Sequence, residues 1–118
     1  MATDEFIAAE TFLDTLVTVT VDRPLGISHP SAGFIYPVNY GYLRGVPAPD
    51  GDDLDAYILG IFAPVNTFSG KCIAVVRRIN EQDDKLIVVS EDKNYSDEQI
   101  YALVEFQERF FESIIVRK

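Results

Sequence analysis

The chain alternates short apolar runs with polar turns, and this pattern predicts β-strands. Residues 16–21 alternate apolar side chains with threonine, which is typical of a strand with one buried face. Residues 54–62 and 85–89 are β-type apolar runs, and residues 70–79 contain a nearly continuous apolar stretch. A continuous stretch of this kind favours burial on both faces of the strand. Residues 39–43 are aromatic and β-prone.

One helix is predicted near the end of the sequence. Ser96 is a good N-cap, and Gln99 completes a capping box with it. The apolar residues from Ile100 to Ile114 fall mostly on one helical face, so we expect the helix to end near Ser113. Residues 114–116 either extend the helix or form a short strand. About five closely spaced strands followed by one helix favour a small β-barrel or strongly curved sheet with the helix packed on it.

The charge balance argues against nucleic-acid binding. The 118 residues carry a formal net charge of −9, with 19 acidic and 10 basic side chains. Binding of DNA or RNA depends on lysine and arginine side chains that neutralise phosphates. A chain of this length is expected to form a single domain over residues 1–118.

The termini and apolar runs indicate a cytoplasmic protein. The first residues are acidic where a signal peptide would be basic, and no run approaches the roughly 18 apolar residues of a membrane span. The single cysteine, Cys72, and the single histidine, His29, exclude a cysteine-rich or multi-histidine zinc site. A bound metal would therefore need oxygen ligands, which favour Mg²⁺, Mn²⁺ or Ca²⁺.

Four carboxylates crowd the segment Asp50-Gly-Asp-Asp-Leu-Asp55. If Asp55 begins a strand, its carboxylate can point back toward the loop that carries Asp50 and Asp52. Three carboxylates would then converge on one point, and we expect them to repel one another unless a cation binds. The alternative is a solvated acidic turn, which is the commoner fate of an acidic loop.

A second acidic turn and an aromatic strand lie near this loop in the sequence. Asp83 and Asp84 precede Lys85, which could hold a phosphate while the acids hold a metal; the alternative is a charged hairpin tip. Alternating tyrosines lie at Tyr36, Tyr40 and Tyr42, and at least two of the three are expected to belong to the core. Gly41, between two of them, suggests a bulge or a close backbone approach. Arg77 and Arg78 should point to opposite faces of their strand.

Taken together, these motifs resemble the soluble family I inorganic pyrophosphatases. Residues 36–42 read Tyr-Pro-Val-Asn-Tyr-Gly-Tyr and are followed by the acidic loop at residues 50–55. The family pattern is Tyr-Pro-x-Asn-Tyr-Gly-Tyr followed by Asp-Gly-Asp-Pro-x-Asp, and the likeness covers about residues 33–90. The resemblance implies an OB-like five-stranded barrel, mainly β with one α-helix, and hydrolysis of pyrophosphate with Mg²⁺ or Mn²⁺.

The resemblance also assigns roles to individual residues. It implies metal binding by Asp50, Asp55 and Asp83, with Asp52 contacting metal and orienting or deprotonating the attacking water. It places Tyr40 beside the substrate and Lys85 on a phosphate. It identifies pyrophosphate or another small phosphoanhydride as the partner molecule, and homo-oligomerisation stays open.

Several positions depart from the family pattern. Asp53 replaces a proline, Asn80 replaces an aspartate, and residues 18–20 (Thr-Val-Thr) replace a Lys-x-Glu pair. The family pattern has an arginine before the aromatic strand, where this chain has residues 27–29 (Ile-Ser-His). The pattern also has a late Tyr-Lys pair, for which this chain has no obvious match. Because the missing residues are mostly phosphate ligands, two alternatives remain: a non-catalytic domain that binds metal, phosphate or a partner, and a hydrolase of another phosphoanhydride.

Overall fold

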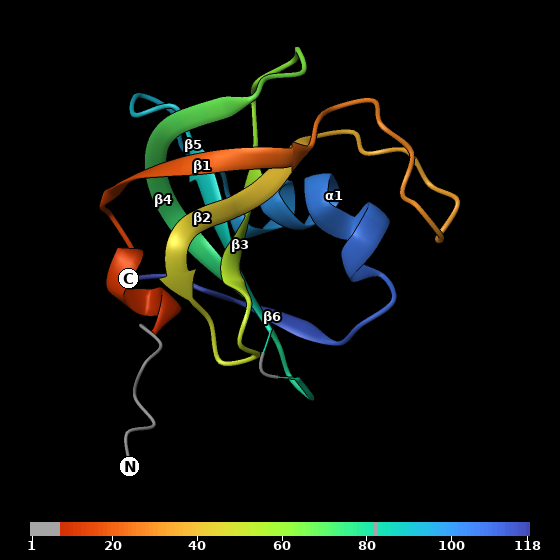
Figure 1. Cartoon of the computed structure of the whole chain (residues 1–118). Coiled ribbons are helices and arrows are strands. Elements are labelled where there is room, and N and C mark those ends of the chain that lie inside the picture. The colour runs from red at the N-terminus through yellow and green to blue at the C-terminus, as the bar shows by residue number, and fades with distance from the viewer. Residues whose placement is uncertain (1–7, 82) are drawn as a thin grey trace.

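Five strands close into a barrel in the computed structural model, which describes residues 8–81 and 83–118 (Figure 1). The strands are hydrogen-bonded in the order β1-β2-β3-β5-β4, and β4 pairs with β1 to complete the barrel. Only β3 and β5 run parallel. The elements are η1 (Ala9–Phe12), β1 (Leu16–Arg23), β2 (Asn39–Pro47), β3 (Asp53–Ile58), β4 (Thr67–Arg78), β5 (Asp84–Val89), α1 (Asp97–Glu108) and β6 (Ser113–Val116). The predicted five-stranded barrel with a C-terminal helix is confirmed.

Strand alternation separates two apolar cores. In β5, Leu86 and Val88 point into the barrel, whereas Ile87 and Val89 point outward beneath the helix. All four side chains are fully buried, as expected for a strand that has protein on both faces. The outer core therefore covers one side of the barrel, and polar residues at its margin can reach a common site.

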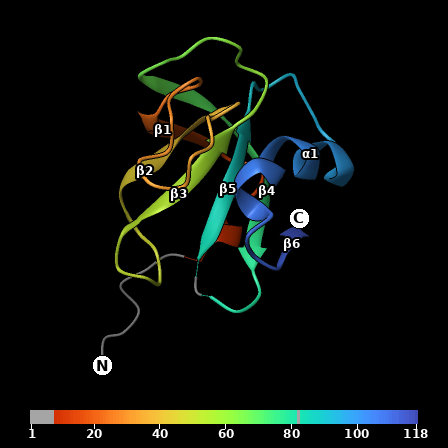
Figure 2. The ribbon, with the colours of Figure 1, turned by 90° about the vertical axis from the view of Figure 1, so that its right-hand side faces the viewer.

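Helix α1 packs against this outer core. Ser96 and Gln99 form the expected capping box, since the serine hydroxyl accepts from Gln99 N at 3.1 Å and Ser96 N donates to Gln99 Oε1 at 2.8 Å. Ile100 and Val104 are buried in the outer core. Figure 2 shows the helix lying beside β4 and β5. No helix in the described part of the chain is long and apolar enough to cross a membrane.

The helix ends five residues earlier than expected. It ends at Glu108 rather than near Ser113, and Phe110 and Ile114 are largely exposed instead of continuing the apolar face. Residues Ser113–Val116 form β6, which pairs antiparallel with the last residues of β4. Pairing with the edge of β4 satisfies the backbone hydrogen-bonding groups of this segment. The spacing of apolar residues does not report this pairing, and it therefore placed the end of the helix too late.

Gly41 confirms the predicted close approach of backbones. A Cβ atom at this position would overlap the backbone of Thr20 and Val21 on β1. Glycine thus permits the tight pairing of β1 with β2, which a long loop connects. In Figure 1 this loop, which spans residues 24–38, extends toward α1. Phe34 from the loop meets Phe106 of the helix with ring centroids 5.4 Å apart.

Candidate functional site

Polar residues at the margin of the outer core line one cavity of about 430 Å³. Tyr40 comes from β2, Asp55 from β3, Arg78 from β4 and Lys85 from β5. Asp55 and Lys85 are direct partners in the parallel β3–β5 pair, and Lys85 is paired with Val76 on the other side. The outward positions of neighbouring strands thus place chemically active side chains from distant parts of the sequence side by side.

Lys85 lies at the centre of the acidic groups. Its Nζ donates to Asp55 Oδ2 at 2.7 Å and to Asp83 Oδ1 at 2.8 Å, and it lies 5.7 Å from the centroid of the Tyr40 ring. The side chain is only 4% exposed. Burial alone would lower the pKa of Lys85, but the neighbouring Tyr40, Asp55 and Asp83 raise the pKa above its usual range. Lys85 therefore remains an ammonium at neutral pH.

A second buried cation, Arg78, connects the barrel to the helix. Its Nε and Nη2 donate to the two carboxylate oxygens of Glu108 at 3.1 and 3.0 Å, and its Nη1 donates to Asp83 at 2.8 Å. The Tyr57 hydroxyl donates to the same Glu108 carboxylate at 2.6 Å. This bidentate arrangement ties the C-terminal end of α1 to Asp83, one of the two carboxylates on Lys85.

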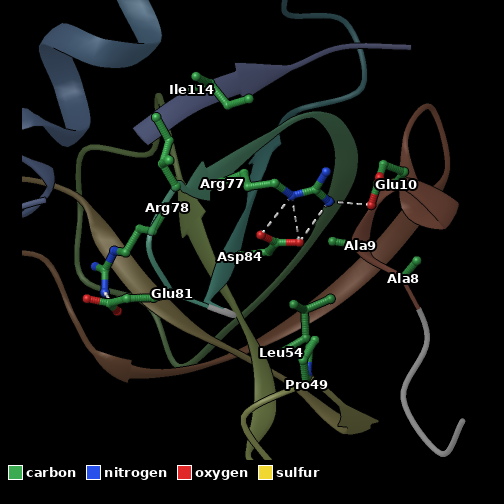
Figure 3. A pocket seen from close by; sticks show the side chains of 11 residues that line it. Ala8, Ala9, Glu10, Pro49, Leu54, Arg77, Arg78, Glu81, Asp84 and Ile114 are labelled. Carbon is green, nitrogen blue, oxygen red and sulfur yellow. Dashed lines mark hydrogen bonds and ion pairs between the residues drawn. The ribbon is translucent and has the colours of Figure 1, made fainter. Parts of the chain in front are cut away.

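The neighbouring Arg77 points away from this site, as strand alternation predicts. Its guanidinium pairs with Asp84 at 2.9 Å and with Glu10 from the 3-10 turn η1. Figure 3 shows these residues at the rim of a separate cavity, with Arg78 directed to the other side beside Glu81. Only one of the two consecutive arginines thus belongs to the candidate site.

The structure brings together some of the predicted site residues and leaves others apart. Tyr40, Asp55 and Lys85 line one cavity, and Asp83 contacts Lys85. Asp50 and Asp52 lie in an exposed turn, where the Asp52 N–H donates to Asp50 Oδ1 at 3.0 Å. Among residues 8–81 and 83–118, no three histidine, cysteine or carboxylate side chains gather closely enough to hold a metal ion. The expected convergence of Asp50, Asp52 and Asp55 is therefore not observed.

Three acidic side chains near the site have basic partners. Asp55 and Asp83 are both bridged by Lys85, and Asp84 is paired with Arg77. These carboxylates nevertheless fit a hard divalent cation in kind, because carboxylate oxygens are the ligands that Mg²⁺ prefers. Metal binding by this set would require Lys85 to release two carboxylates to the ion.

Three residues in or beside the candidate site were not predicted from the sequence. Arg23, at the end of β1, lines the cavity and makes no ion pair among the described residues. Gln107 and Glu108 interrupt the apolar face of α1, and both are buried. Gln107 accepts from the Tyr36 hydroxyl at 2.9 Å and donates to the Tyr57 hydroxyl at 2.7 Å. Adjacent polar residues on an otherwise apolar helix face were the signal available for a buried network.

The tyrosines near the site mostly belong to the outer core, as expected. Tyr36 is 2% exposed and Tyr40 is 9% exposed, whereas Tyr42 is half-buried. Tyr57, a residue of β3, is fully buried beside them. Burial raises the pKa of each of Tyr36, Tyr40 and Tyr57, and for Tyr57 the Glu108 carboxylate raises it further. Tyr40 and Tyr57 therefore remain protonated in the folded protein well above the pH at which a free tyrosine ionises.

These raised pKa values predict a loss of stability in alkali. Above about pH 10 an unfolded tyrosine releases its proton, whereas folded Tyr57 keeps it. Rising pH therefore stabilises the unfolded state relative to the folded state, and the free energy of unfolding falls. We expect Tyr57→Phe to reduce this slope by up to about 1.4 kcal/mol per pH unit. Urea unfolding between pH 8 and pH 11.5 measures the slope. Tyr101→Phe, on the exposed side of α1, should keep the wild-type slope, and equal slopes for both variants would contradict the prediction.

Comparison with known proteins agrees with this architecture. A family model described as inorganic pyrophosphatase matches residues 14–115. No curated protein matches the chain. The inorganic pyrophosphatase of Ehrlichia chaffeensis superposes with a TM-score of 0.67 at 12% identity, covering 96% of this chain and 89% of that one. The enzyme of Helicobacter pylori gives a TM-score of 0.61 at 16% identity, with coverages of 98% and 88%. At these identities the solved structures show a shared fold.

Proposed function

Because the chain belongs to the inorganic pyrophosphatase family, we propose that it hydrolyses inorganic pyrophosphate to phosphate with Mg²⁺ as its metal ion. The observation that carries this proposal is the cavity itself. Tyr40, Asp55 and Lys85 line it from three different strands, and Arg23 adds a cation that is free of ion pairs among the described residues. This combination of carboxylates, cations and a phenol suits a small anion that is brought in with a divalent ion.

In this proposal the chain's carboxylates bind the metal ions and activate the attacking water. Asp50, Asp52, Asp55 and Asp83 would hold Mg²⁺, for which Mn²⁺ can substitute, if the turn that carries Asp50 and Asp52 approached Asp55 on metal binding. When bound, the ions supply an acidified water and neutralise charge on the leaving phosphate. The exposed carboxylate of Asp52 orients the attacking water and accepts its proton.

The basic residues of the cavity bind the substrate. Lys85 exchanges its contacts with Asp55 and Asp83 for a phosphate oxygen, so the same side chain neutralises the carboxylates in the empty site and the anion in the filled one. Arg23 contacts the second phosphate, and the Tyr40 hydroxyl donates to a phosphate oxygen. Positioning of this kind accounts for most of the protein's part in phosphoryl transfer.

The direct test is phosphate release from pyrophosphate by the purified protein. We expect turnover with Mg²⁺ in excess over pyrophosphate, and no turnover with EDTA. A sample purified in parallel from cells that lack the expression plasmid controls for the host enzyme. Absence of turnover above that control with both Mg²⁺ and Mn²⁺ would overturn the proposal.

A second candidate function is binding without hydrolysis. The observation that favours it is the internal pairing of both buried cations: Lys85 contacts two carboxylates, and Arg78 contacts Glu108 and Asp83. Cations that are already neutralised attract a polyanion less strongly. Isothermal titration calorimetry separates the two functions, because this candidate predicts binding of metal and phosphate compounds with no release of phosphate.

A further inference from the structure

The candidate cavity is lined in part by aromatic rings that the proposed hydrolysis of pyrophosphate does not use. His29 and Phe34 come from the loop between β1 and β2, and Phe110 and Phe111 follow the end of α1. We call these four residues the aromatic wall. They line the same cavity as Lys85, so one ligand can touch the charged and the aromatic halves together.

Three rings of the aromatic wall, those of His29, Phe34 and Phe110, are packed against one another. The His29 and Phe34 centroids are 4.9 Å apart, and Phe34 and Phe110 lie nearly parallel with centroids 6.2 Å apart. His29 Nδ1 accepts from the backbone N–H groups of Ser31 and Ala32 at 3.1 and 2.9 Å, which fixes the orientation of its ring. The wall is therefore shaped before any ligand binds.

Two rings of the wall remain open to solvent although they line a cavity. Phe110 is 62% exposed and Phe111 is 37% exposed, while the Arg78 guanidinium carbon lies 3.6 Å from the centroid of the Phe111 ring. Burying exposed aromatic surface against a planar ring is favourable, and it is the way in which proteins bind nucleobases without sequence preference. Arg78, which contacts the Phe111 ring, also lines the cavity.

The size of the cavity indicates the same kind of ligand. A volume of about 430 Å³ falls within the usual range for small-molecule sites. Inorganic pyrophosphate consists of two phosphate groups, which suit the cationic side chains of Arg23 and Lys85. The phenyl rings of Phe34, Phe110 and Phe111 offer no hydrogen-bond donor to pyrophosphate, whereas a base joined through a ribose to a diphosphate has one part for these rings and one for the cations.

We propose that the ligand class of this cavity is the nucleoside diphosphates, with the base on the aromatic wall and the diphosphate beside Arg23 and Lys85. The inference rests on the proposed function in one respect, since both assign the phosphates to the same half of the cavity. It differs in assigning a role to Phe34 and Phe110, which inorganic pyrophosphate leaves without a partner.

The test compares two non-hydrolysable ligands that differ only in the nucleoside. α,β-Methylene-ADP and methylenediphosphonate are titrated into the full chain with Mg²⁺ by isothermal titration calorimetry. We expect the nucleotide to bind at least tenfold more tightly, because stacking of one base on aromatic side chains contributes about that much or more. Equal affinities for the two ligands, or no binding of the nucleotide, would overturn the inference.

A matched pair of variants locates the effect on the wall. Phe110→Ala should weaken binding of α,β-methylene-ADP about tenfold and leave the affinity for methylenediphosphonate unchanged. Phe62→Ala, at an 85% exposed position outside the cavity lining, should change neither affinity. A thermal melt checks that both variants are folded. If Phe110→Ala instead dissolves a dimer and leaves nucleotide affinity unchanged, the wall is a contact between copies and the inference is wrong.

The outcomes separate this inference from the proposed function. Hydrolysis of pyrophosphate combined with equal affinities for the two probes would leave the proposed function standing and overturn the inference. Tight and Phe110-dependent nucleotide binding without phosphate release from pyrophosphate would support the inference and overturn the proposed function.

Discussion

Replacing Glu108 with alanine is expected to lower the free energy of unfolding by about 3–5 kcal/mol, because it removes one partner of a buried ion pair. The Glu108 side chain is fully buried and receives hydrogen bonds from Arg78 and Tyr57. Its loss leaves the Arg78 guanidinium, 7% exposed, without its bidentate partner. For a domain of this size the melting temperature should fall by on the order of 15 °C. Thermal and urea unfolding followed by circular dichroism measure the change.

A matched variant and a double-mutant cycle show whether the buried pair is the cause. Glu105→Ala removes an exposed pair with Arg109 on the same helix and should cost less than about 1 kcal/mol. The cycle uses the single variants Arg78→Met and Glu108→Leu and the double variant that combines them. The double variant should lose about 2 kcal/mol less free energy of unfolding than the two single variants lose together, since no unpaired charge stays buried. Losses that simply add, or a Glu105→Ala loss as large as that of Glu108→Ala, would contradict the interpretation.

The second large effect concerns catalysis. Asp52→Asn is expected to lower the rate of phosphate release from pyrophosphate by about 10²–10⁴-fold, because an amide cannot accept the proton of the attacking water. The exposed Asp52 contacts the rest of the described structure through its backbone, which accepts from Ala48 N at 2.8 Å and donates to Asp50. The variant should therefore melt within a few degrees of the wild-type protein. A stopped assay for inorganic phosphate measures the rate.

The neighbouring residue is the control for this effect. Asp53→Asn removes the same charge from the same turn, and the asparagine oxygen can still accept from Gly45 N as Asp53 Oδ2 does at 3.3 Å. We expect its rate to stay within about threefold of the wild-type rate, as for a surface substitution away from the reacting atoms. Equal losses in both variants would mean that the charge of the turn matters and that Asp52 has no specific role.

The sequence by itself determined the architecture and the family. Alternating and continuous apolar runs predicted the strands, because side-chain direction in a strand follows from local backbone geometry. Ser96 and Gln99 marked the beginning of the helix for a similarly local reason. Gly41 predicted a bulge or a close backbone approach, and the structure shows a close approach of β1 and β2 there. The motifs at residues 36–42 and 50–55 were sufficient to identify the family.

Only the tertiary structure decided what the charged residues of the site contact. Asp55 and Lys85 are 30 residues apart, and the parallel register of β3 and β5 places them together. Arg78 and Glu108 are also 30 residues apart and meet because α1 packs on the outer core. No local pattern shows that Lys85 neutralises two predicted metal ligands, since ion-pair partners depend on the packing of distant segments. The helix boundary at Glu108 has the same origin, because β4 offers a strand edge to which residues 113–116 bind.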